Sequence, residues 1–297
     1  MSYFLAFCLA LCWGTAFLAS KNIVDVLPPY WGAFYRVLAG LLFFTVFFTV
    51  RRASFKCPIK ELWRPIAISF MLILLPFAAL SWGIQYTVPT IAGIFNGTVP
   101  IWSFIGGALL LKGEDRFTWR RAAGVLIGLA GLLVIMHPQW QAALHVPAGK
   151  MALWGYGALL VMALSYGLGN VMTKKIMVDN HTVAWEANTF YQYLFAAVAL
   201  LLISLGTEAT PSWAVFNTKL VLSIICAGVF SSAVAFLLMI ALIKRWGATR
   251  MASVTYFSPI IAMGTDILFR GRTPHLPELV GMIFIFISLW LIQKQVN

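Results

Sequence analysis

Long apolar runs separated by short polar segments recur along the whole chain. A helix that crosses a bilayer needs about 20 apolar residues, because each residue rises about 1.5 Å. Runs of this length predict an all-α membrane protein with ten transmembrane helices. The ten predicted spans cover residues 2–20, 30–50, 65–83, 88–111, 120–136, 151–171, 184–205, 219–241, 249–269 and 276–293.

Composition agrees with a bilayer environment. Of the 297 residues, 61% are hydrophobic and 10% are charged; a soluble globule of this size would need more polar groups on its surface. The net charge of +12 does not indicate nucleic-acid binding, because the 21 Lys and Arg residues are scattered through short loops and form no aromatic-interleaved basic face. We expect a lipid bilayer as a partner and no nucleic acid.

Lys and Arg are unequally distributed between the two sides of the predicted membrane. With ten spans, both termini share one side, and that side collects fifteen of the basic residues, against five on the other side and Arg36 inside a span. The positive-inside rule assigns the richer side to the cytoplasm. We therefore expect a multi-pass protein with both termini in the cytoplasm.

The second half of the chain repeats features of the first. A proline-centred stretch at 90–101 recurs at 249–260, and two further pairs of segments match at similar offsets. Similar offsets indicate a duplicated unit, and a unit with an odd number of spans enters the membrane from opposite sides in its two copies. We expect two inverted five-helix repeats (5+5), residues 1–138 and 151–297, joined by a connector at 139–150.

Pro100 and Pro259 are predicted helix breaks inside the fourth and ninth spans. A proline in a helix leaves the carbonyl four residues earlier without its donor, and lipid offers no water to replace it. Those carbonyls belong to Asn96 and Thr255, at equivalent positions of the two repeats. We predict that both face a shared cavity near mid-depth, where transporters with inverted repeats bind solute. Alternatively, the two side chains hydrogen-bond to neighbouring helices.

Four motif-like segments stand out along the chain: CWGTAF at 12–17, Pro28-Pro29 followed by Arg36, the turn at 112–114 and the glycine-rich run at 124–131. Together with the ten short spans, they resemble the EamA family of the drug/metabolite transporter superfamily. The resemblance covers nearly the whole chain and implies a carrier of small organic solutes, commonly an exporter of amino acids or related metabolites in bacterial inner membranes. It also implies a cavity lined by Trp13, Trp82, Asn96, Trp102, Tyr166, Asn170, Ser231, Thr255 and Tyr256.

Two charged residues within spans each have two interpretations. Arg36 lies roughly two turns below the outer surface, where it either anchors the helix by reaching the interface or contacts the solute. Glu186 lies in the first turn of the seventh span. It either couples proton movement to transport or complements the positive end of the helix dipole.

The sequence shows no signature of an enzyme or of an ATP-driven pump. A GxxxxGKS/T phosphate loop and an HExxH motif are both missing, and the four Cys and four His residues have no metal-ligand spacing. We therefore expect no cofactor and no metal, and predict a secondary transporter that exports a small metabolite by alternating access. The alternatives are an importer or exchanger of a cationic or nucleotide-derived solute and, in another class, a membrane scaffold or sensor. Monomer and homodimer both stay open.

Overall fold

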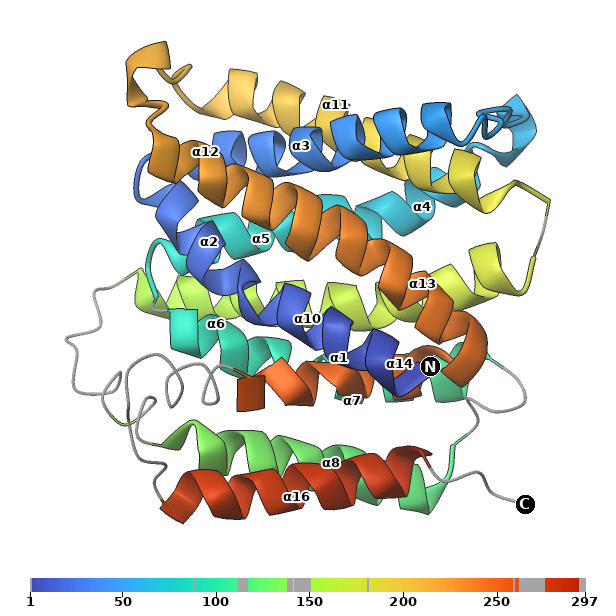
Figure 1. Cartoon of the computed structure of the whole chain (residues 1–297). Coiled ribbons are helices and arrows are strands. Elements are labelled where there is room, and N and C mark those ends of the chain that lie inside the picture. Colours follow the sequence, from blue (N-terminus) through green and yellow to red (C-terminus); the bar gives the residue numbers. More distant parts are fainter. Residues whose placement is uncertain are drawn as a thin grey trace.

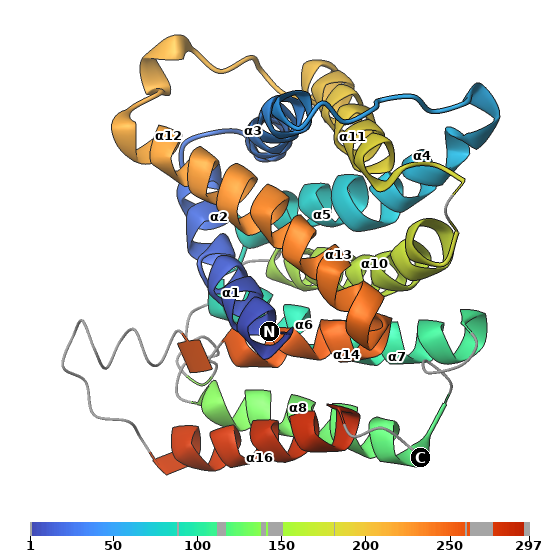
Figure 2. The same ribbon diagram turned by 45° about the vertical axis from the view of Figure 1, so that its right-hand side comes forward.

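The computed structural model describes residues 2–87, 89–111, 117–137, 141, 151–180, 182–258, 260–261 and 276–293. Every regular element in these ranges is helical. The helices lie side by side in a bundle, and both views place α8 (Trp119–Ile135) and α16 (Leu276–Gln293) together at one edge (Figures 1 and 2).

Eight helical segments among the described residues are long and apolar enough to cross a membrane. They are Ser2–Val24, Pro29–Val50, Ile59–Ile84, Ile91–Leu110, Ala152–Val178, Trp185–Thr207, Thr218–Trp246 and Leu276–Gln293. These segments coincide with eight of the ten predicted spans, with ends that differ by a few residues. The chain is thus a multi-pass, all-α membrane protein.

The two other predicted spans are not among these eight segments. The predicted span 120–136 is helical, as α8, but its 17 residues make it shorter than the eight segments above. The predicted span 249–269 is described only in part, as α14 (Ala248–Ala252) and η7 (Ser253–Phe257) with a short continuation to 261. The arrangement of ten spans in two inverted repeats stays a prediction.

Several of the long segments are interrupted or change their helical geometry on the way. The first divides at Thr15 into α1 (Ser2–Gly14) and α2 (Ala16–Val24), and the fourth divides at Gly97–Thr98 into α6 (Pro89–Asn96) and α7 (Val99–Leu110). Three others contain a wider π-helical stretch. They run as α4 (Trp63–Ser69), η2 (Phe70–Leu74) and α5 (Leu75–Ile84); as α10 (Ala152–Met172) and η4 (Thr173–Val178); and as α12 (Thr218–Ile225), η6 (Cys226–Val234) and α13 (Ala235–Trp246).

The start of α3 (Pro29–Val50) is capped by a residue distant in sequence. Pro29 suits the first turn of a helix, because the backbone N–H that proline lacks would have no partner there. The Glu208 carboxylate accepts hydrogen bonds from the backbone N–H groups of Tyr30 and Trp31 at 3.0 Å each. Glu208 directly follows α11 (Trp185–Thr207), so this cap connects α3 with a helix from the second half of the chain.

Glycines allow α8 and α16 to approach closely. A Cβ atom added at Gly131 would lie 2.8 Å from the carbonyl oxygen of Gly281, and one added at Gly281 would lie 2.6 Å from that of Gly131. Small residues at such crossings are the usual means of close helix packing in membranes. The glycine-rich run at 124–131 therefore serves helix packing.

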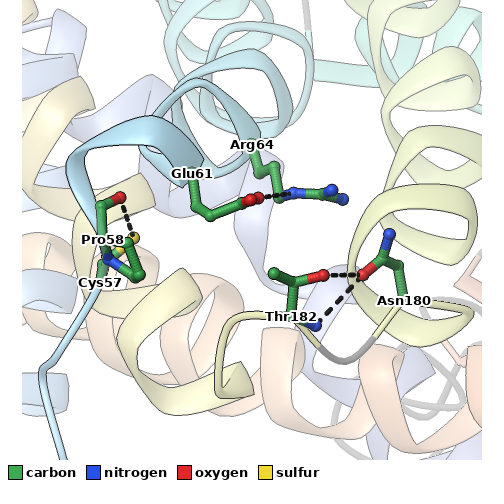
Figure 3. Close-up of polar contacts among 6 residues, drawn as sticks. All are labelled: Cys57, Pro58, Glu61, Arg64, Asn180 and Thr182. Carbon is green, nitrogen blue, oxygen red and sulfur yellow. Dashed lines mark hydrogen bonds and ion pairs between the residues drawn. The ribbon is translucent and has the colours of Figure 1, made fainter.

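Local polar contacts stabilise the chain just before α4 and just after η4 (Figure 3). Glu61 and Arg64 form an ion pair within a single turn, and the Thr182 backbone N–H and hydroxyl both donate to the Asn180 side-chain oxygen. The Cys57 thiol contacts the Pro58 carbonyl at 3.7 Å. Partial burial raises the pKa of the Cys57 thiol, and the negative charge of Glu61 adds a smaller rise. The thiol therefore stays largely protonated at neutral pH.

Candidate solute-binding cavity

A cavity lies inside the bundle, between elements from both halves of the chain. The space in it that is open to the centre of a water molecule is about 80 Å³. One water molecule needs about 10–15 Å³ by this measure, so the cavity has room for several waters or for a small solute. Its walls combine aromatic side chains with a few hydroxyl, amide and guanidinium groups, a composition typical of small-molecule sites.

The cavity lies where the helices depart from regular α geometry. Leu72 and Ile73 belong to the π-helical η2, and Ser231 and Ser232 belong to the π-helical η6. Asn96 is the last residue of α6, and Trp13 and Ala16 flank the interruption at Thr15. Such departures redirect side chains and free backbone groups, and they are frequent at functional sites.

Six of the nine side chains predicted for the cavity line it. They are Trp13, Asn96, Tyr166, Asn170, Ser231 and Thr255. Asn96 and Thr255 thus lie in the wall of one cavity, although 159 positions separate them in the sequence. The binding roles of these residues stay predictions.

The other three lie outside the lining that the described residues form. The Trp82 ring contacts that of Tyr86, with centroids 5.0 Å apart. The Trp102 indole N–H donates to the Thr98 hydroxyl at 3.1 Å, across the interruption between α6 and α7. The fully buried Tyr256 donates its hydroxyl hydrogen to the Val125 carbonyl at 2.9 Å. In this conformation, the three side chains contact neighbouring residues of the protein outside the described lining.

The predicted helix break near Pro100 is present, but it precedes the proline. The interruption falls at Gly97–Thr98, and Pro100 lies in the first turn of α7, where the missing N–H costs no helical hydrogen bond. The Thr98 hydroxyl and backbone N–H both donate to the Phe95 carbonyl, at 2.7 and 2.9 Å, and close the turn at the interruption. Pro259 lies outside the described residues.

Arg36 lies in the cavity wall and is 5% exposed. Its Nε donates to the Ser232 hydroxyl at 2.9 Å and its Nη1 to the Ser20 hydroxyl at 3.2 Å. Its guanidinium carbon lies 4.0 Å from the centre of the Phe77 ring, within cation–π distance. The side chain therefore points into the protein interior and not toward the membrane interface.

Hydrogen bonds fix several of the polar groups around the cavity. The Asn170 amide donates to the Ser103 hydroxyl at 3.3 Å, and that hydroxyl lies 3.1 Å from the Gly167 carbonyl, to which it donates. The hydroxyls of Thr15 and Ser231 are 3.3 Å apart. Contacts of this kind orient polar side chains that an apolar environment would otherwise leave without partners.

Glu186 lies apart from this cavity. It is half-buried in the first turn of α11, the position that complements the helix dipole, and the described lining of the cavity does not include it.

Some lining residues were not predicted from the sequence. Tyr193, Ser232, Phe77 and Phe236 reach the cavity from α11, η6, α5 and α13. Membrane helices are apolar over most of their surface, so hydrophobic periodicity does not reveal which face points inward. One available signal was the polar pair Ser231-Ser232 inside an apolar span.

These features define a polytopic helical membrane protein with a solute-sized internal cavity. The sequence model of the EamA-like transporter family matches residues 1–137 and 153–293. The chain belongs to the EamA-like transporter family, and the resemblance seen in the sequence is confirmed.

Two of three similar curated relatives carry transporter names. A probable amino-acid metabolite efflux pump of Salmonella typhimurium is 26% identical over 298 residues, covering 97% of this chain and 93% of its own. An uncharacterized transporter of Bacillus subtilis is 27% identical, covering 97% and 90%. A WAT1-related chloroplastic protein of Arabidopsis thaliana is 26% identical over 94% of this chain, which spans 66% of that protein's length. The efflux pump and the uncharacterized transporter are named as transporters, and the family model likewise describes transporters.

A solved crystal structure has the same fold. It superposes with a TM-score of 0.74 over 98% of this chain and 95% of its own, at 18% sequence identity.

Proposed function

We propose that the chain is a secondary transporter that exports a small organic metabolite, an amino acid or a related compound, across the inner membrane by alternating access. Ten transmembrane helices form two inverted five-helix repeats, residues 1–138 and 151–297, with both termini in the cytoplasm. The excess of Lys and Arg on one side of the predicted topology supports this orientation. A relative named as an amino-acid metabolite efflux pump supports the solute class.

The observation that carries the proposal is a cavity shared by the two halves of the chain. Trp13 and Asn96 come from the first half, and Tyr166, Asn170, Ser231 and Thr255 from the second. A site between two repeats opens to either side when the repeats rock against each other. These six residues are the proposed solute contacts, with Trp13 and Tyr166 as aromatic surfaces and the amides and hydroxyls as hydrogen-bonding groups.

Counterflow with the purified chain in proteoliposomes tests this function. Vesicles loaded with one unlabelled solute are diluted into the same labelled solute, across a panel of amino acids, amines and nucleotide derivatives. We expect at least one amino acid to accumulate transiently in vesicles that contain the protein and not in empty ones. Movement of amines or nucleotide derivatives alone would favour the importer or exchanger, and movement of no solute would contradict transport.

Direction is tested in cells. Expression of the chain is expected to raise the external concentration of the exchanged amino acid, and a rise in the internal concentration would contradict export.

A further inference from the structure

The cavity wall contains a buried cation whose described partners are all neutral. Arg36 donates to two serine hydroxyls and lies over an aromatic ring. Arg36 takes part in none of the ion pairs of the described residues, and the lining that they form contains no acidic side chain. A guanidinium keeps its charge in proteins, and a buried charge is unfavourable unless it is paired.

Three surrounding elements hold the guanidinium in place, but the two serine hydrogen bonds do not use all of its donors. Ser20 comes from α2, Phe77 from α5 and Ser232 from η6. The two serine bonds use Nε and Nη1, so the Nη2 hydrogens, two of the five donors of the group, take no part in them.

The backbone of α3 at Arg36 also packs closely against another helix. A Cβ atom added at Gly228 in η6 would lie 2.4 Å from the Arg36 carbonyl oxygen. The absence of a side chain at position 228 lets η6 lie directly against the backbone of Arg36. The cation is therefore built into the contact between a helix of the first half and a helix of the second.

We propose that Arg36 is the anion subsite of this cavity and binds the carboxylate of the transported solute. The proposal rests on the transport function above and narrows its solute class. A carboxylate offers two oxygens to the planar guanidinium and makes a stronger hydrogen bond to it than a neutral group does. A solute carboxylate would also supply the negative charge that the described lining lacks.

The rest of the cavity indicates the remainder of the solute. Trp13, Phe17 and Phe236 present apolar surface, while Asn96 and Tyr166 offer neutral hydrogen-bonding groups. An organic carboxylate with an apolar body fits these walls, whether or not it carries an amino group. An amine without a carboxylate would bring a second positive charge next to Arg36, and like charges at close range repel. The cavity is therefore selective for carboxylates over amines.

Binding of matched probes to the purified full-length chain tests the proposal. One probe set is L-leucine, 4-methylpentanoate and 3-methylbutylamine, and the second is L-phenylalanine, 3-phenylpropanoate and 2-phenylethylamine. Each set keeps one carbon skeleton and varies the charged groups. Affinity is measured by tryptophan fluorescence and by thermal stabilisation of the protein. In at least one set, we expect the wild-type chain to bind the carboxylates at least about tenfold more tightly than the amine.

The variants are Arg36→Gln and Arg36→Lys, with Arg245→Gln as the matched control. Arg245 is exposed at the end of α13 and bonds to the Ser2 hydroxyl, so its loss should leave all affinities unchanged. Arg36→Gln should weaken carboxylate binding about tenfold or more. Amine binding should stay equal or become tighter, because the charge that repels the amine is removed. Arg36→Lys keeps the charge but not the planar guanidinium, so we expect a smaller loss of carboxylate affinity in this variant. Arg36→Lys is the test variant if Arg36→Gln does not fold.

The outcomes separate this inference from the transport function. Equal binding of acids and amines by the wild-type chain, or no binding of any carboxylate probe, would overturn the anion subsite. An equal loss of affinity for the acids and the amines in the Arg36 variants would also overturn it, because that result indicates a purely structural role for Arg36. Selective binding without counterflow of any solute would contradict transport and leave the subsite standing.

Discussion

At the scale of single residues, Gly228 lies tightly against the backbone of Arg36 in the wall of the candidate site. An added Cβ at position 228 would also lie 2.7 Å from the Ala39 Cβ atom. A backbone carbonyl cannot rotate out of the way, so η6 would have to move away from α3. Position 228 therefore controls both the stability of the bundle and the placement of the proposed anion subsite.

Gly228→Ala is predicted to destabilise the protein by about 1–3 kcal/mol, the usual cost of overpacking a well-packed core. Gly157→Ala in α10 is the matched control, because an added Cβ there meets nothing within 4 Å. The measurement is the midpoint of thermal unfolding in one detergent. We expect a lower midpoint for Gly228→Ala alone, and equal midpoints for the two variants would contradict the close contact.

The sequence identified some residues of the cavity better than others. Trp13, Asn96 and Thr255 could be predicted because they belong to repeated or motif-like segments. Tyr256 is adjacent to Thr255, yet its ring fits against Gly128 of α8 and its hydroxyl bonds to Val125. Arg36 was left between anchor and solute contact, since its direction depends on Ser20, Phe77 and Ser232 from three other helices. Such long-range packing is not encoded in local pattern.

At the scale of elements, the cap on α3 connects distant parts of the chain. The first N–H groups of a helix have no partner within it, and at Tyr30 and Trp31 the Glu208 carboxylate supplies one. The negative charge also complements the positive end of the α3 dipole. Because Arg36 lies about one and a half turns further along the same helix, this cap helps to position the cavity.

Glu208→Ala is predicted to lower stability by about 0.5–2 kcal/mol, the range found for lost helix caps. The control is Asp25→Ala, which removes a partly exposed ion pair with Lys21, worth about 0.3–0.5 kcal/mol. Thermal unfolding of both variants beside the wild type decides the matter. A loss for Glu208→Ala no larger than that for Asp25→Ala would show that the cap contributes little.

The position of the fourth-span interruption shows what a local rule can and cannot predict. Proline was expected to break the helix from within, which would free the Asn96 carbonyl. The helix instead ends at Asn96 and begins again at Val99, so that Pro100 occupies a first-turn position. The break and its neighbour Asn96 were predictable from the sequence. The geometry of the turn was not, because Thr98 stabilises it through bonds with Phe95 and Trp102.

At the scale of the whole molecule, the position of Glu186 bears on how transport is coupled to a source of energy. Glu186 lies in the first turn of α11, away from the lining of the cavity, so any role in coupling would act on the movement of α11 and not on the solute directly. The dipole interpretation requires no such role. The two interpretations differ in the pH dependence of transport.

Glu186→Gln distinguishes the two interpretations of this carboxyl. If Glu186 carries the coupled proton, the variant should lose pH-driven accumulation of solute and retain counterflow, which needs no net proton movement. Asp179→Asn is the control, since Asp179 is an acid paired with Lys174 at the end of η4. Wild-type pH dependence in Glu186→Gln would assign the residue to the helix terminus alone.

The central claim is that one cavity between the two halves opens in turn to each side of the membrane. Two-sided labelling of Asn96→Cys, in a chain whose four native cysteines are replaced, tests it most directly. A membrane-impermeant thiol reagent is applied from outside or from inside oriented proteoliposomes, with Ser204→Cys, buried within α11, as the unreactive control. We expect Asn96→Cys to react from both sides and to be protected by the solute that the counterflow assay identifies. Reaction from one side only, or no reaction from either side, would contradict alternating access through this cavity.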